Sequence, residues 1–312
     1  MAMKLMVGIL AAGLVAVTSI RAQPAPSVLF IGNSFTFADG APVRFYRADT
    51  VHDLNNEGIG GVPALFKSFA TQVGLNYDVS LETHPGIGLD WHLANKREAI
   101  GGRPWDVVVM HGYSTLDAEK PGDSDKLVRT TVEMSELLRA KNPRVAIHLV
   151  ATWTRADQTF ASSGHWFQKP VEAMATDVRA AYDRAAAAAH ATSVIPVGEA
   201  WLRAIHTGAA DANPYDGIDA GKFDLWAYDH YHASTFGYYL EALSDFGAVT
   251  GKDPRVLGDT ECSAFELGLA RPQVRVLQQI AFDELSAAKL VPSAQAAPAA
   301  GRAGPVRCAG AR

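Results

Sequence analysis

Three residues in two distant motifs have the types and spacing needed for nucleophilic chemistry. Ser34 follows an apolar run, 28–31, and a glycine. Such a run predicts a buried strand, and ligands bind at the carboxyl ends of strands in an open α/β sheet. A serine attacks a carbonyl group when a base takes its proton. Asp229 and His232, three residues apart, predict that base and the carboxylate that orients it.

The same residues have plainer interpretations. Ser34 could be a turn serine that hydrogen-bonds its own backbone, and the histidine motif could be an exposed polar loop. Asp229, His230 and His232 could also bind zinc together with His92 or His111. Their spacing matches no strong metal signature, so the sequence predicts neither a metal site nor a cofactor.

Acyl transfer also needs hydrogen-bond donors for the oxyanion that forms on the carbonyl. The backbone N–H of Ser34 is one candidate. Gly86 is a second, because a loop glycine allows its N–H to approach a ligand closely, although it could equally be a turn residue after a proline. A side-chain donor would come from the end of the third predicted strand, at His111, Tyr113 or Ser114.

Strands alternate with helices along the chain, which predicts a mostly parallel sheet covered on both faces. The expected fold is a three-layer, doubly wound, flavodoxin-like α/β domain with five strands. The strands are expected at residues 28–31, 77–82, 105–110, 144–150 and 193–197. The helices are expected at residues 63–74, 89–100, 126–141, 170–190, 233–249 and 272–290.

A long connection at residues 38–61 follows the first strand. Connections of this length are usually functional lids or disordered segments. The aromatic residues Phe37, Phe45 and Tyr46 favour an ordered lid.

The two ends of the chain differ from its centre in composition. Residues 1–22 have a lysine, an apolar run and small residues, which predicts a cleaved signal peptide; a membrane anchor is the alternative, but the run is short for a span. The folded domain is expected at residues 23–291. Residues 292–312 are rich in Ala, Pro and Gly, which predicts a disordered tail.

Charge and cysteine content limit the partners and the compartment. A net charge of −5 argues against nucleic acid as a partner, and no later apolar run is long enough for membrane insertion. Because the leader predicts export, the mature protein is expected to be an exported protein, either periplasmic or secreted. Cys262 and Cys308 are the two cysteines, and an oxidising compartment permits a disulfide between them. The sequence leaves that pairing open.

At this point the chain resembles the SGNH/GDSL hydrolase superfamily, over roughly residues 27–258. The segments that carry the resemblance are Gly32-Asn33-Ser34-Phe35, Gly86-Ile87-Gly88-Leu89-Asp90-Trp91-His92, Thr152-Trp153, Pro196-Val197-Gly198-Glu199-Ala200-Trp201 and Asp229-His230-Tyr231-His232-Ala233-Ser234. The first is similar to the subgroup with Gly-Asn-Ser-Phe in place of Gly-Asp-Ser. No single segment is specific for the superfamily, but the order in which they occur together is specific.

The resemblance implies a serine esterase with Ser34, Asp229 and His232 as its triad. It implies Ser34 and Gly86 as oxyanion donors, with Gly60 a less favoured choice. The superfamily's usual asparagine donor is missing; His111 stands near that point, so either His111 donates or two donors remain. The implied substrate is a small-molecule or carbohydrate ester with a short acyl group such as acetyl.

Two other function classes remain compatible with the sequence. One is a catalytically weak carbohydrate- or ligand-binding protein on the same fold, which the missing asparagine permits. The other is a metal-dependent hydrolase that uses the histidine cluster. Trp91, Trp153, Trp166 and Trp226 could stack on a sugar ring, although core filling is the commoner role of such residues.

Overall fold

The structure is a computed structural model that describes residues 24–293 and residue 308. Within them lies one sheet of six parallel strands in the order β2-β3-β1-β4-β5-β6. The strands are β1 Ser27–Gly32, β2 His52–Asp53, β3 Asp78–Thr83, β4 Val107–Met110, β5 Ala146–Val150 and β6 Ser193–Ile195. The predicted leader, 1–22, and all of the predicted tail except residues 292, 293 and 308 lie outside the described residues.

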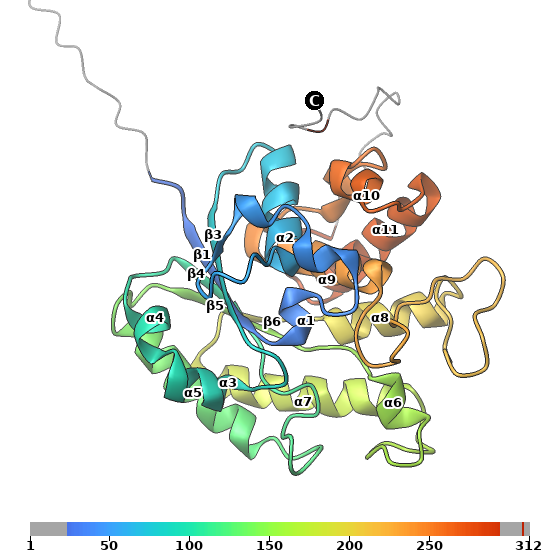
Figure 1. Cartoon of the computed structure of the whole chain (residues 1–312), viewed down its shortest axis with the longest axis horizontal. Helices are drawn as coiled ribbons and strands as arrows, with labels where there is room; N and C mark the ends of the chain where they lie inside the picture. The colour runs from blue at the N-terminus through green and yellow to red at the C-terminus, as the bar shows by residue number, and fades with distance from the viewer. Residues whose placement is uncertain (1–23, 294–307, 309–312) are drawn as a thin grey trace, which may run out of the picture.

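Helices cover both faces of the sheet, which gives three layers (Figure 1). One face carries α2 Gly61–Gln72, α8 Val197–His206, α9 Thr235–Thr250 and α11 Arg271–Ala287. The other carries α3 Leu89–Asn95, α4 Arg97–Gly101, α5 Asp125–Arg139 and α7 Glu172–Ala189. The remaining short helices are α1 Ser34–Phe37, η1 Pro42–Phe45, η2 Ala48–Thr50, α6 Ala156–Thr159, η3 Pro254–Leu257 and α10 Cys262–Glu266.

Strand β1 is buried along its whole length because apolar layers pack on both of its faces. Val28 and Phe30 belong to the core under α2, α9 and α11. Leu29 and Ile31 belong to the core under α3, α5 and α7. This two-sided burial explains why β1 is a continuous apolar run rather than an alternating pattern.

The predicted α/β fold is confirmed, and the strand count is corrected from five to six. The added strand, β2, has two residues and pairs with β3 at the sheet edge, so it is too short to leave a pattern in the sequence. The helix predicted at 89–100 is two helices, because Lys96 has a φ of −127°. Segment 38–61 is ordered and contains η1, η2 and β2.

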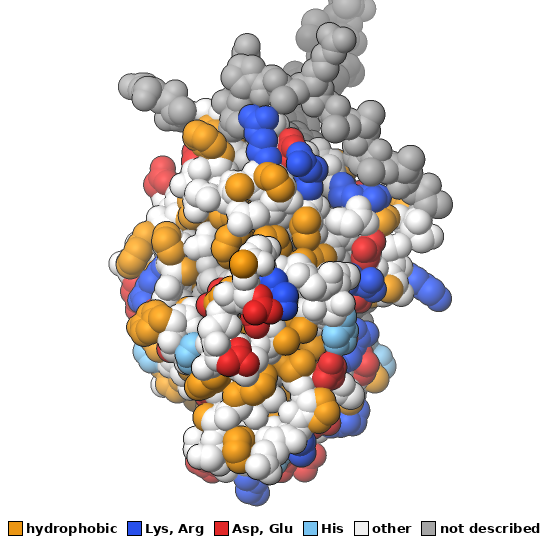
Figure 2. Space-filling view, turned by 90° about the vertical axis from the view of Figure 1, so that its right-hand side faces the viewer, with side chains coloured by type: hydrophobic (Ala, Val, Ile, Leu, Met, Phe, Trp, Pro, Cys, Tyr) orange, Lys and Arg blue, Asp and Glu red, His pale blue; other side chains and the backbone are white. Residues whose placement is uncertain are grey.

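The surface facing the viewer in Figure 2 mixes side-chain types. Hydrophobic side chains are scattered there among polar and charged ones. Among the described residues, no helix combines the length and the apolar character that a membrane span requires.

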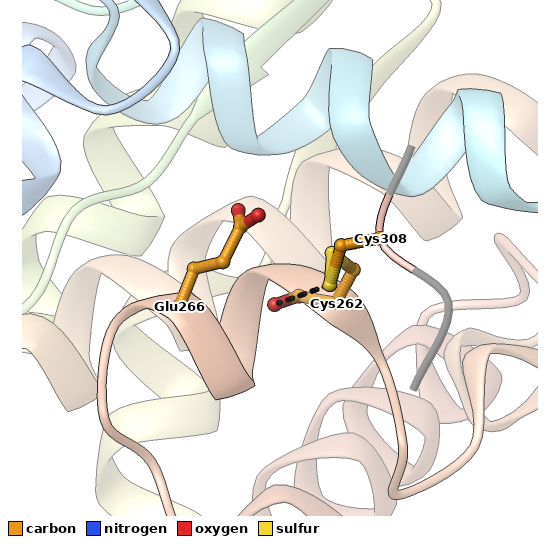
Figure 3. Close-up of side chains that lie close together, drawn as sticks. All are labelled: Cys262, Glu266 and Cys308. Carbon is orange, nitrogen blue, oxygen red and sulfur yellow. Dashed lines mark hydrogen bonds between the residues drawn. A yellow bond between two sulfur atoms is a disulfide. The ribbon is translucent and has the colours of Figure 1, made fainter. Parts of the chain in front are cut away.

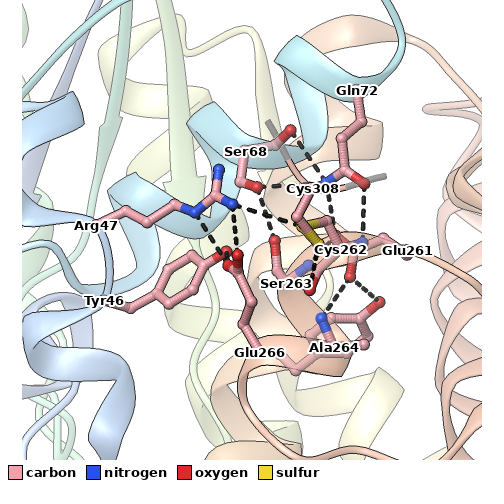
Figure 4. The surroundings of a disulfide bond; sticks show 11 residues. Tyr46, Arg47, Ser68, Gln72, Glu261, Cys262, Ser263, Ala264, Glu266 and Cys308 are labelled. Carbon is pink, nitrogen blue, oxygen red and sulfur yellow. Dashed lines mark hydrogen bonds and ion pairs between the residues drawn. A yellow bond between two sulfur atoms is a disulfide. The ribbon is translucent and has the colours of Figure 1, made fainter. Parts of the chain in front are cut away.

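A disulfide joins Cys262 to Cys308, with a Cα–Cα distance of 5.3 Å (Figure 3). It answers the pairing that the sequence left open. Beside it, Glu266 accepts hydrogen bonds from Tyr46 at 2.6 Å and from Arg47 at 2.7 and 3.0 Å (Figure 4). Segment 38–61 is thus tied to the C-terminal part of the domain.

Candidate active site

Ser34 lies at the carboxyl end of the central strand, as the first residue of α1. The turn forms because the side-chain oxygen of Asn33 caps the helix, accepting from the Phe35 N–H at 3.1 Å. The Asn33 carbonyl accepts from the N–H groups of Thr36 and Phe37 at 3.0 and 3.1 Å. That carbonyl shares a peptide group with the N–H of Ser34, so both bonds polarise this N–H as a donor.

Asn33 also ties the serine turn to two other loops. Its amide nitrogen donates to the carbonyl oxygens of Ile87 at 2.9 Å and Gly112 at 3.2 Å. These loops follow β3 and β4, the two strands that flank β1. The side chain therefore fixes the position of Ser34 relative to both neighbouring strand ends.

Asp229 and His232 form a hydrogen-bonded pair. The Nδ1 of His232 lies 2.6 Å from the Oδ2 of Asp229. The other carboxylate oxygen accepts from the backbone N–H groups of Tyr231 at 3.0 Å and His232 at 2.9 Å. Burial alone would raise the pKa of Asp229, but these bonds lower it below its usual value. The turn requires a left-handed residue, His230, with a φ of +58°.

The second ring nitrogen of His232 is available for proton transfer. Nε2 is buried and has no hydrogen-bond partner among the described residues. The ring packs edge-on against Phe35, the neighbour of Ser34, with centroids 5.9 Å apart. The two candidate motifs therefore meet in space. Ser34 and His232 share no hydrogen bond in the described part of the chain, and such bonds often tighten only with substrate bound.

The two glycines considered as oxyanion donors differ in their surroundings. Gly86 is exposed, has a φ of +68°, and its N–H has no acceptor among the described residues. The N–H of Gly60 donates to the carbonyl of Arg44 at 2.8 Å, and Gly60 packs directly on the Tyr46 carbonyl. The geometry thus leaves Gly86, not Gly60, able to donate to a ligand.

His111 is buried, and both of its ring nitrogens have protein partners. Nδ1 lies 3.0 Å from the Gly112 carbonyl, which can only accept, so Nδ1 carries a proton. Nε2 lies 2.8 Å from the hydroxyl of Thr36. Burial lowers the pKa of His111 to about 4, which keeps the ring neutral. A neutral ring arranged in this way has no second N–H for an oxyanion, contrary to the expected donor role.

Sequence reasoning missed a buried polar network beneath the serine turn. His92 lies 2.9 Å from the Gly32 carbonyl through Nε2 and pairs with Glu82 through Nδ1. Both side chains are fully buried. The opposite oxygen of Glu82 accepts from Asn55 at 3.1 Å. The sequence carries no local signal for this network, because its members come from three separate segments.

The proposed metal ligands are largely committed to protein partners. His92 and His111 use both ring nitrogens as described above. Within the described residues, the one cluster of three metal-ligating side chains is Cys262, Glu266 and Cys308. Its two sulfur atoms are bonded to each other, so they are not free thiolates.

The tryptophans near the site mainly fill the core. Trp153, Trp166 and Trp226 are at most 1% exposed. Trp153 lies between two parallel rings, Phe35 at 3.9 Å and Trp201 at 4.8 Å between centroids. Trp91, the fourth tryptophan considered, is partly exposed.

A cavity of about 260 Å³ lies between the two motifs. It is lined by Asn33, beside Ser34, and by Tyr231, beside His232. Gly86, Ser114 and Arg155 also line it. A substrate group that occupied this cavity would therefore contact the chain neighbours of Ser34 and His232.

No protein-family model matches the chain, and no curated protein matches it. Solved structures do resemble it. A DUF4886 family protein from Bacteroides uniformis superposes with a TM-score of 0.58 at 17% identity, over 84% of this chain and 95% of that one. A proposed GDSL-like lipase from Parabacteroides merdae superposes with a TM-score of 0.52 at 15% identity, over 75% of this chain and 99% of that one. A proposed SGNH hydrolase from Slackia heliotrinireducens superposes with a TM-score of 0.50 at 21% identity, over 72% of this chain and 100% of that one.

These identities are low, so the likeness concerns the fold. The chain has a parallel α/β fold whose structural neighbours include proteins described as SGNH and GDSL-type hydrolases.

Proposed function

We propose that the protein is an exported serine esterase that hydrolyses carboxylic esters of short acyl groups, such as acetyl groups on a carbohydrate. It would belong to the SGNH/GDSL subgroup with a Gly-Asn-Ser-Phe first block. The observation that carries this proposal is the Asp229–His232 pair at 2.6 Å, whose free ring nitrogen is buried beside the turn that bears Ser34.

The proposed mechanism uses two half-reactions. His232 takes the proton of Ser34 as the hydroxyl attacks the ester carbonyl, and then gives it to the leaving alkoxide. Water repeats the sequence on the acyl-enzyme. Asp229 holds the tautomer with its proton on Nδ1. The N–H groups of Ser34 and Gly86 stabilise the oxyanion, and His111 supports the turn through Thr36.

Export is proposed from two observations. The composition of residues 1–22 is that of a signal peptide. The Cys262–Cys308 disulfide is a feature of proteins from oxidising compartments.

Intact-mass labelling with a fluorophosphonate tests the nucleophile. We expect one adduct on the wild type, none on Ser34→Ala, and one on the control Ser286→Ala, which alters a serine of α11. Ester hydrolysis should disappear in Ser34→Ala while the thermal unfolding temperature stays close to that of the wild type. A folded wild-type protein that takes no label would refute the assignment and favour a binding role on the same fold.

A further inference from the structure

Arg155 is held rigidly at the wall of the cavity beside the candidate triad. Its Nε and Nη2 donate to Asp157 at 3.0 and 2.6 Å, and its Nη1 donates to the Ser114 hydroxyl at 3.1 Å. The guanidinium lies 3.6 Å from the ring centroid of Tyr231, in cation–π contact. That ring stacks in turn on His232, with centroids 4.1 Å apart.

These contacts leave hydrogen-bonding capacity facing the cavity. A guanidinium has five N–H donors, and the bonds within the described residues use three of them. The Ser114 oxygen accepts from Arg155, and its own O–H has no acceptor among the described residues. Gln158 lines the same wall; its amide nitrogen donates to Asp157 at 3.2 Å and its oxygen accepts from the His165 N–H at 3.2 Å, which leaves the second amide N–H as a donor. An occupant with several oxygen atoms would therefore find both donors and acceptors at fixed positions.

The charge of this wall is balanced. Arg155 is the single charged side chain among the lining residues that the structure describes, and Asp157 pairs with it through two hydrogen bonds. A balanced pair gives little net attraction to an anion. The apolar part of the lining is Ala118, Pro121 and the rings of Tyr113 and Tyr231. An alkyl chain would still leave the polar groups of the wall without partners, which is costly.

We propose that Arg155, held by Asp157 and stacked on Tyr231, binds the hydroxyl groups of a neutral, polyhydroxylated substrate and selects such esters over aliphatic ones. This inference rests on the proposed esterase function. It assigns to Arg155 the binding of the group attached to the ester, separately from the bond-breaking step. Sites built to hydrogen-bond a substrate hydroxyl discriminate strongly against analogues that lack it.

The test compares two acetate esters of similar size. Glycerol monoacetate carries two neighbouring hydroxyls, and propyl acetate carries none. We expect the ratio of kcat/KM for the first over the second to fall about 10- to 100-fold in Arg155→Met, the range for losing hydrogen bonds from a charged group. The double variant Arg155→Met/Asp157→Asn removes the pair without leaving a lone charge, and should show the same fall.

Arg179→Met is the matched control. Arg179 lies on α7, bonds Asp183 at 2.9 Å and Glu199 at 2.7 Å, and does not line the cavity. Its ratio should equal that of the wild type. An unchanged ratio in both Arg155 variants would overturn the inference, including the case in which both esters slow equally because Tyr231 and His232 have shifted. Wild-type protein that cleaves neither ester would instead contradict the esterase proposal.

Discussion

Replacing Asp229 by asparagine should nearly abolish ester hydrolysis, and the structure gives the reason. One carboxylate oxygen accepts from two backbone N–H groups, at 2.9 and 3.0 Å. In Asp229→Asn these donors require the amide oxygen, so the NH₂ group must face the Nδ1 of His232. Nδ1 then has to accept, which moves the ring proton to Nε2, the nitrogen needed as the base.

The magnitude follows from the cost of the alternative orientation. Turning the amide over would leave two N–H groups without an acceptor, at about 1–3 kcal/mol each, or about 2–6 kcal/mol in total. The inactive tautomer should therefore dominate. Loss of the same tautomer in a Ser-His-Asp enzyme lowers kcat about 10⁴-fold, and we expect a fall on the order of 10³- to 10⁴-fold here.

The assay is kcat for an acetate ester at neutral pH, with the rate of fluorophosphonate labelling as a second readout. Asp224→Asn is the control, because Asp224 lies in the same loop and accepts from the backbone N–H of Trp226 at 3.0 Å without contacting His232. It should keep activity within about threefold of the wild type. An Asp229→Asn variant within tenfold of wild-type kcat would refute the orienting role of this carboxylate.

Three further predictions concern stability. Burial raises the pKa values of Glu241 and Asp245 well above the usual range, and the charge of Asp245 raises that of Glu241 further. The unfolded chain therefore ionises first as pH rises, so the stability of the native state falls above about pH 4.5. Glu241→Gln should stabilise the fold more at pH 7.5 than at pH 4, as measured by urea unfolding. Equal effects at both pH values would contradict this. Cys262→Ser removes the disulfide between residues 46 apart and should lower the free energy of unfolding by about 4 kcal/mol by the loop-entropy relation. A decrease below about 1 kcal/mol in guanidinium unfolding would argue against this. In Gly32→Ala the new Cβ would lie 2.5 Å from the Nε2 of His111, so we expect a loss of about 1–3 kcal/mol together with slower labelling, and a variant with wild-type values for both would count against this packing.

The sequence predicts the sheet well because its central strands are buried on both faces. Residues 28–31 are all apolar, as expected for a parallel strand that is covered by helices on both faces. Helix α8 was not predicted from the residues, although its buried face of Val197, Ala200, Trp201 and Ala204 has helical spacing. The strand expected at residues 193–197 overlaps the first residue of this helix, which hides the start of the helical spacing.

The candidate site was predictable where its contacts are local. Asp229 and His232 are three residues apart, and one turn of chain brings them together. The hydrogen bond between Thr36 and His111 spans 75 residues, and no local pattern reports it. No local pattern marks Arg155 as a site residue, because its place at the cavity depends on its contacts with Asp157, Ser114 and Tyr231.

The stack of Phe35, Trp153 and Trp201 gives the molecule an optical reporter of its own. Two indole rings lie there with centroids 4.8 Å apart and planes 5° from parallel, and aromatic rings fixed by tertiary packing give a near-ultraviolet circular dichroism signal that is lost when that packing is lost. The other face of Trp153 lies against the ring of Phe35, which adjoins Ser34. Near-ultraviolet circular dichroism should therefore report, with no added dye, whether the packing beside Ser34 survives a substitution in the serine turn.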